Sequence, residues 1–185
     1  SGLSINTADP MSLCKSQTDR EVRSRCYGNY KATVLSMINT SDTKGSQQKI
    51  EKLYGNASPT DTQGAFWSLG YEWARTKLVA DADIPRAIEA CANLSTENIP
   101  ACIGGASVGI AKHGLPWEQH LLITDFCAQA RSTLPNIKPG DCPSAQAVGY
   151  LRGMYSPSAF TKAYANMTAT LGEVVPLEYP PRFGY

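Results

Sequence analysis

Residues 99–118 read IPACIGGASVGIAKHGLPWE, and this stretch decides the fold class. Pro100 suits the first turn of a helix, and the apolar run behind it continues to Gly114, a residue typical of helix ends. Pro116 then begins another helix. Nothing here alternates apolar and polar side chains as a half-buried strand does. The predicted helices are 99–112 and 116–131, and the second would place on one face Trp117, Leu121, Thr124 and Ala128.

Helix-start signals followed by apolar side chains at helical spacing recur along the chain. Asp9 precedes Pro10, and Thr18 forms a capping box with Glu21. The sequence therefore predicts an all-α protein, a compact irregular bundle of about seven to nine short helices stapled by disulfides. Further helices are expected over 18–39, 46–54, from Pro59 onward, and over 83–93, 143–154 and 157–171.

The chain has six cysteines, and none of them forms a C-x-x-C pair. Zinc ribbons, c-type haem attachment and thioredoxin-like chemistry therefore lack their signature. An even number at wide spacings predicts three disulfides formed in an oxidising compartment. The alternative is six buried thiols in a cytosolic core. Many connectivities are possible, but the spacing favours local pairs, namely Cys14 with Cys26, Cys91 with Cys102, and Cys127 with Cys142.

The beginning of the chain, Ser1 to Ser4, has neither the basic stretch nor the apolar core of a signal peptide. With disulfides, this predicts a mature exported protein that is secreted, extracellular or periplasmic. Four N-x-S/T sequons suggest a glycoprotein. The alternative is a Ser/Thr-rich bacterial export that never meets the glycosylation machinery. The candidate sites are Asn39, Asn56, Asn93 and Asn166.

Composition excludes several function classes. The formal net charge is +1, whereas nucleic-acid binders normally carry a basic stripe. The longest apolar stretch, 103–111, is too short and too rich in glycine to span a membrane. No P-loop, G-x-G-x-x-G or G-x-S-x-G motif occurs. We therefore expect no nucleic-acid partner, no membrane span and no cofactor.

Two constellations carry residues suited to chemistry. His113, Glu118 and His120 include both histidines, but Gly114 and Pro116 break the helix between them and the H-E-x-x-H spacing is absent, so no metal site is expected. The second constellation is centred on the carboxylate of Glu72.

Glu72 lies among Trp67, Tyr71 and Trp73, and a carboxyl group in apolar surroundings can act as a general acid. This supports a cell-wall or polysaccharide hydrolase as an alternative function. Because Glu72 also stands three residues before Arg75, a structural ion pair is the simpler interpretation.

Two pairs of glycines stand four residues apart, Gly105 with Gly109 and Gly149 with Gly153. Glycine at this spacing lets a neighbouring helix approach closely, which would offset its cost inside a helix of about 1 kcal/mol. We therefore predict tight helix packing at both pairs.

The chain changes character near its end. We predict a single all-α domain over 1–172 and an extended, Pro- and aromatic-rich tail over 173–185, since prolines at this density forbid a helix. The tail is expected to dock either on its own domain or on a protein partner. Its expected partner-binding residues are Tyr179, Pro180, Pro181, Phe183 and Tyr185.

The early pattern, Cys14 followed by Cys26-Tyr27-Gly28, resembles exported bacterial immunity proteins that block cell-wall amidases, the Tai-type family of type VI secretion. The resemblance covers roughly residues 1–40, and the later part of this longer chain departs from the family's pattern. It implies a small, helical, disulfide-bonded periplasmic inhibitor.

Taken together, the residues favour a non-catalytic exported protein that serves as a structural or accessory binding subunit of an extracytoplasmic assembly. Nine Tyr and three Trp suit amphipathic contacts with a protein partner. Three alternatives remain open: the hydrolase that uses Glu72, a carrier of a small apolar ligand inside the bundle, and the periplasmic inhibitor or immunity-type protein.

Overall fold

The computed structural model describes residues 9, 11–29, 39, 41–54, 57–134 and 136–174. This part of the chain contains helices, turns and loops, and no strand. Its helices number nine when the continuous α5, π-helix η1 and α6 count as one, so the predicted all-α, disulfide-stapled bundle is confirmed. The elements are α1 (Ser12–Lys15), α2 (Arg20–Asn29), α4 (Thr43–Leu53), α5 (Pro59–Trp73), η1 (Ala74–Leu78), α6 (Val79–Asp81), α7 (Ile84–Ala92), α8 (Ile99–His113), α9 (Gln119–Thr133), α10 (Ala145–Met154) and α11 (Pro157–Leu171).

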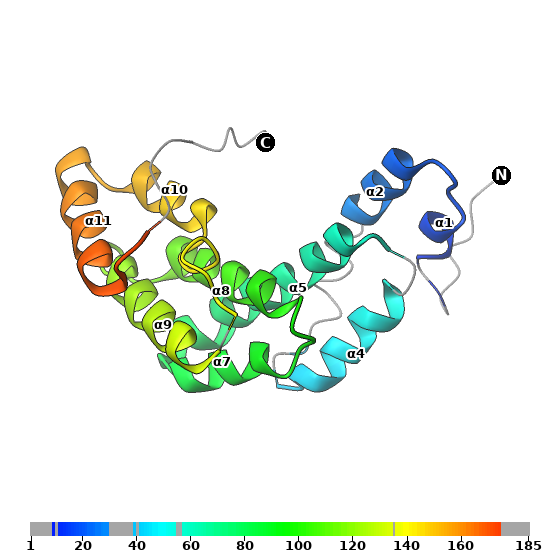
Figure 1. The fold of residues 1–185 in the computed structure, drawn as a ribbon, viewed down its shortest axis with the longest axis horizontal. Coiled ribbons are helices and arrows are strands. Elements are labelled where there is room, and N and C mark those ends of the chain that lie inside the picture. Colours follow the sequence, from blue (N-terminus) through cyan, green and yellow to red (C-terminus); the bar gives the residue numbers. More distant parts are fainter. Residues whose placement is uncertain are drawn as a thin grey trace.

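The helices are arranged around a central pair, α5 and α8 (Figure 1). α1, α2 and α4 gather at one end of the molecule, and α9, α10 and α11 lie at the other end (Figure 1). Helix α8 is buried along almost its whole length, which explains its apolar composition. The largest fully buried side chains of the central helices and α9 are Phe66, Leu69, Ile103, Ile110, Ile123 and Phe126.

Glycines allow α5 and α8 to pack closely. A Cβ atom on Gly105 would overlap the carbonyl oxygen of Trp67, and one on Gly109 would lie 2.7 Å from the carbonyl oxygen of Tyr71. The predicted close packing is therefore confirmed for this pair. It is wrong for Gly153, where an added Cβ would meet nothing within 4 Å. Gly153 lies on the exposed side of α10, so no other helix packs against it.

Two helix starts differ from the prediction. The N-terminal cap of α2 is Asp19, whose carboxylate accepts the backbone N–H of Val22 at 2.9 Å, instead of Thr18. Helix α9 begins at Gln119, three residues later than expected, because Trp117 has a φ of +69°. A right-handed helix excludes that conformation. The part of the predicted helix 18–39 beyond residue 29 falls outside the described residues, apart from Asn39.

The three predicted disulfides are all present, and no cysteine is free. Each bridge joins neighbours in sequence and ties one helix to the next segment of chain. This confirms the local pairing and fits an oxidising compartment. The bridges are Cys14–Cys26, Cys91–Cys102 and Cys127–Cys142.

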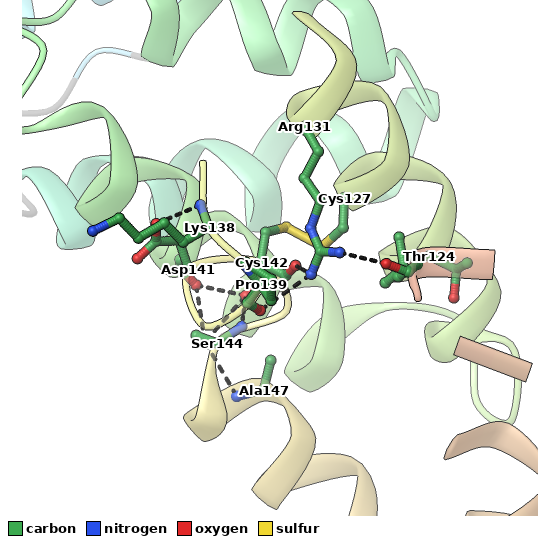
Figure 2. Close-up of a disulfide and its surroundings, with 12 residues drawn as sticks. Thr124, Cys127, Arg131, Lys138, Pro139, Asp141, Cys142, Ser144 and Ala147 are labelled. Carbon is green, nitrogen blue, oxygen red and sulfur yellow. Dashed lines mark hydrogen bonds between the residues drawn. A yellow bond between two sulfur atoms is a disulfide. The ribbon is translucent and has the colours of Figure 1, made fainter. Parts of the chain in front are cut away.

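Arg131 of α9 lies beside the third disulfide (Figure 2). It binds the loop between α9 and α10, which we call the Arg131-bound loop. Its Nη2 atom donates to the carbonyl oxygen of Cys142 at 2.6 Å, and its Nη1 atom to that of Leu171 at 2.7 Å. Burial lowers the pKa of this guanidinium. The segment after α11 is thereby fixed against α9. The four carbonyl acceptors belong to Pro139, Cys142, Leu171 and Glu173.

Within the ranges that the structure describes, no helix has the length and apolar character needed to cross a membrane.

Candidate functional site

The fold brings together one residue from each of the two constellations that the sequence places far apart. Tyr71 at the end of α5 and His113 at the end of α8 share a hydrogen bond of 2.7 Å between the hydroxyl and Nε2. The rings meet edge to face, with centroids 5.6 Å apart. Partial burial lowers the pKa of His113, and the charges of Lys112 and Arg75 lower it further. The imidazole is thus held by the tyrosine through both the hydrogen bond and the ring contact.

Glu72 lies in an ion pair with Arg75, its neighbour one helical turn along. The guanidinium donates to both carboxylate oxygens, and the Nε to Oε2 distance is 3.1 Å. The hydrogen bond to this carboxylate and its charge raise the pKa of Arg75. The Glu72 side chain is 16% exposed. This arrangement is the structural ion pair that the sequence spacing allowed.

A π-helix, η1, begins directly after these residues and interrupts the long α5–α6 helix. Such single-turn π segments inside α-helices are frequent at functional sites. Here Gly109 of α8 lies close to Ala74, the first residue of η1, since a Cβ on the glycine would lie 2.8 Å from the Ala74 Cβ. Helix α8 therefore packs closely against the start of the π turn.

His120 takes part in a second tyrosine–histidine contact. Its Nδ1 lies 3.3 Å from the hydroxyl of Tyr155, and that hydroxyl donates to Oε1 of Gln119 at 2.8 Å. Burial lowers the pKa of His120 and raises that of Tyr155. The two histidines therefore have different partners on different helices.

The described residues contain no group of three or more His, Cys, Asp or Glu side chains arranged to hold a metal ion. Glu118, which the sequence places between the histidines, is exposed at the start of α9.

Four large apolar side chains that are close in sequence to Trp117 or to its ring partner Tyr155 are exposed, and we call this set the Trp117 patch. The indole of Trp117 packs on the Tyr155 ring with centroids 5.3 Å apart, yet Trp117 remains 61% exposed. Leu115 on the same loop is 67% exposed, and Leu121 in the first turn of α9 is 50% exposed. Met154, next to Tyr155 at the end of α10, is 42% exposed. The patch consists of Leu115, Trp117, Leu121 and Met154.

Sequence reasoning missed this patch. It expected Trp117, Leu121, Thr124 and Ala128 to share one face of a helix that begins at Pro116. Only Thr124 is buried. The left-handed backbone at Trp117 delays the start of the helix until Gln119. Because such a conformation is uncommon for a bulky residue, no local signal could have indicated it.

Other predicted positions are distributed over the surface. Asn39, Asn93 and Asn166 are exposed, and Asn56 lies outside the described residues. Asn39 and Asn93 both lie beside the first half of α4, through Ser46 and Gln47 respectively. The expected partner-binding residues of the tail also lie outside the described part, namely Tyr179, Pro180, Pro181, Phe183 and Tyr185.

An open pocket of about 590 Å³ lies between the start of α8 and the Arg131-bound loop. Its lining mixes charges of both signs with a little apolar surface, among them Glu97, Lys138 and Asp141. The Asp141 carboxylate is used within the loop, where it accepts the backbone N–H of Lys138 at 2.8 Å. The pocket therefore offers few convergent groups for a ligand.

Comparison of the chain with protein families, with curated proteins and with solved structures finds no match.

Proposed function

We propose that this protein is a non-catalytic, exported binding subunit of an extracytoplasmic assembly, and that the Trp117 patch is its docking surface for a protein partner. The observation that carries the proposal is the exposure of four large apolar side chains, 42% to 67% each, in the segments around Trp117 and Tyr155, whose rings are in contact. Exposed apolar clusters of this kind are typical of interaction sites.

The energetics favour covering this patch. Full burial of a Leu or Met side chain stabilises a protein by about 1.5 to 3 kcal/mol. Because these side chains are about half exposed, roughly half of that free energy could still be gained when a partner covers them. Tryptophan is among the residues that most often dominate the affinity of an interface. Trp117 is already held in one position by the Tyr155 ring, so binding would cost little additional side-chain entropy.

The compartment is part of the same proposal. Three disulfides support export to the periplasm or the cell exterior. The three exposed sequons support passage through a secretory pathway. The ion pair of Glu72 with Arg75 supports the non-catalytic part, because the guanidinium occupies both oxygens of the carboxylate that a hydrolase would need.

Site-specific photo-crosslinking in the producing cell tests the proposal. A benzophenone amino acid is placed at Leu121, inside the patch, and in a matched control at Val22, which has the same 50% exposure on α2. We expect a discrete adduct with one other protein from position 121, and at least five times less of it from position 22. Equal yields at both positions, or no adduct with another protein, would contradict the proposal.

A further inference from the structure

We propose that Met154 is an oxidation site that controls docking at the Trp117 patch, and that conversion of its thioether into the sulfoxide releases the protein partner. The inference rests on the proposed function, because it assigns a regulation to the same surface and the same partner. The modifying agent is a peroxide, and its target is the sulfur atom of Met154.

Met154 carries the accessible sulfur atom of the part of the chain that the structure describes. It is 42% exposed, whereas Met11 and Met167 are fully buried at 0%. All six cysteines are joined in disulfides, so no thiolate competes for the oxidant. Met37 lies outside the described residues. A peroxide that reaches the described surface therefore reacts first at Met154.

The position of Met154 links this sulfur to the patch. Met154 is the last residue of α10 and directly precedes Tyr155, whose ring lies 5.3 Å from the indole of Trp117 between centroids. Tyr155 is itself fixed, because it is 7% exposed and its hydroxyl donates to Oε1 of Gln119 at 2.8 Å. Consecutive Cα atoms are about 3.8 Å apart, and one side of an ordinary protein interface covers about 800 Å². An interface of that size centred on Trp117 extends over Met154.

The reaction needs no other group of the protein. A lone pair of the Met154 sulfur attacks one oxygen of the peroxide, the O–O bond breaks, and an S=O bond forms. The sulfur loses two electrons and the peroxide gains them, so that its second oxygen leaves as water when the oxidant is hydrogen peroxide. The product side chain is polar and chiral, whereas methionine is apolar and flexible.

The exposure of Met154 determines what the added oxygen does. In the free protein the sulfoxide remains hydrated, so the fold tolerates it. Under a docked partner the same oxygen would lose its water, and a buried polar group without a hydrogen bond is unfavourable. Oxidation of Met154 therefore weakens docking and leaves the domain folded. A methionine sulfoxide reductase reverses the change with two electrons from a dithiol, and the oxygen leaves as water.

Hydrogen peroxide treatment of the purified full-length chain tests the site of oxidation. After the treatment, reduction of the disulfides and trypsin digestion place Met154 on the peptide 153–162 and Met167 on the peptide 163–182. We expect the peptide with Met154 to gain one oxygen atom at least five times faster than the peptide with Met167. Equal rates, or a faster reaction at Met167, would overturn the inference.

Crosslinking from Leu121 in the producing cell tests the consequence. Peroxide should lower the yield of the partner adduct at least five-fold in the wild-type chain. In Met154→Leu, which has no sulfur to oxidise, the ratio of treated to untreated yield should stay near one. Met154→Gln, which is polar throughout, should lower the yield without peroxide. Val22→Gln is the control, at a position of α2 that is 50% exposed.

The outcomes separate the regulation from the proposed function. An adduct that peroxide leaves unchanged in the wild-type chain would overturn the regulation and leave the proposed function standing. The same holds for an adduct that peroxide abolishes equally in Met154→Leu. Absence of the adduct in untreated cells would overturn the proposed function, and the regulation of docking with it.

Discussion

Gly105 of α8 lies so close to the carbonyl oxygen of Trp67 in α5 that a methyl group at this position would overlap it. The relationship is reciprocal, since Gly70 of α5 stands in the same way against the carbonyl oxygen of Cys102 in α8. Each glycine faces the backbone of the other helix, and backbone cannot move aside as a flexible side chain can. The two central helices, and with them the disulfide at Cys102, are therefore positioned by these glycines.

Replacing Gly105 by Ala should destabilise the fold by about 3 kcal/mol or more, because the overlap falls on backbone. The matched control is Gly64→Ala in α5, where an added Cβ meets nothing within 4 Å. That change should stabilise the protein by about 0.5 to 1 kcal/mol through helix propensity. Urea unfolding with the disulfides intact measures both. Similar effects of the two substitutions would contradict the packing described for α5 and α8.

Arg131→Met should cost about 2 to 4 kcal/mol, because four backbone carbonyls lose a charged donor. Arg131→Lys should recover less than half of the loss, since one ammonium lacks the planar fork that reaches both segments. Lys162→Met, at an exposed position of α11, is the control. Hydrogen exchange should accelerate over 136–144 in the Arg131 variants alone. Unchanged exchange there would show that Arg131 does not hold this loop.

The free energy of unfolding should fall as the pH drops from about 7.5 to about 5.5. Burial lowers the pKa of both His113 and His120 in the folded state, so the unfolded chain binds more protons below the ordinary value of about 6.5. Their stabilising contribution is complete above that value and is lost as the pH falls through the lowered folded values. The double variant His113→Gln, His120→Gln should show a flatter pH dependence in urea titrations. An unchanged slope would refute this assignment.

In a glycosylating secretory host, the chain should carry N-linked glycans at the exposed sequons. Asn39→Gln, Asn93→Gln and Asn166→Gln should each remove one glycan-sized increment from the intact mass. Asn136→Gln, an exposed asparagine outside any sequon, should change nothing of this kind. A chain without glycans from such a host would contradict the prediction.

Local signals in the sequence were sufficient to predict several helix starts and the pairing of the cysteines. Asp83 before Pro85 and Ser156 before Pro157 begin helices as expected, and both side chains cap them. The cysteines pair with their neighbours because each bridge closes a short loop between adjacent elements. These features depend on a few residues at fixed spacing, and so they can be recognised without knowledge of the tertiary structure.

The candidate site could not be predicted in the same way. The contact of Tyr71 with His113 joins residues 42 positions apart, and it exists only because α5 and α8 pack closely. The Trp117 patch depends on one left-handed residue that is not glycine. Long-range packing and an uncommon backbone conformation have no local signature, whereas caps and proline-led helix starts do.

The native size of the assembly in the producing cell tests the central claim, that the Trp117 patch binds a protein partner. Wild-type chain, Leu121→Asp and the equally exposed control Val22→Asp would each be tagged, expressed in that cell and sized without denaturation. The account predicts a complex larger than the monomer for wild type and Val22→Asp, and a monomer for Leu121→Asp. A monomer in all three cases, or a complex that Leu121→Asp leaves intact, would contradict it.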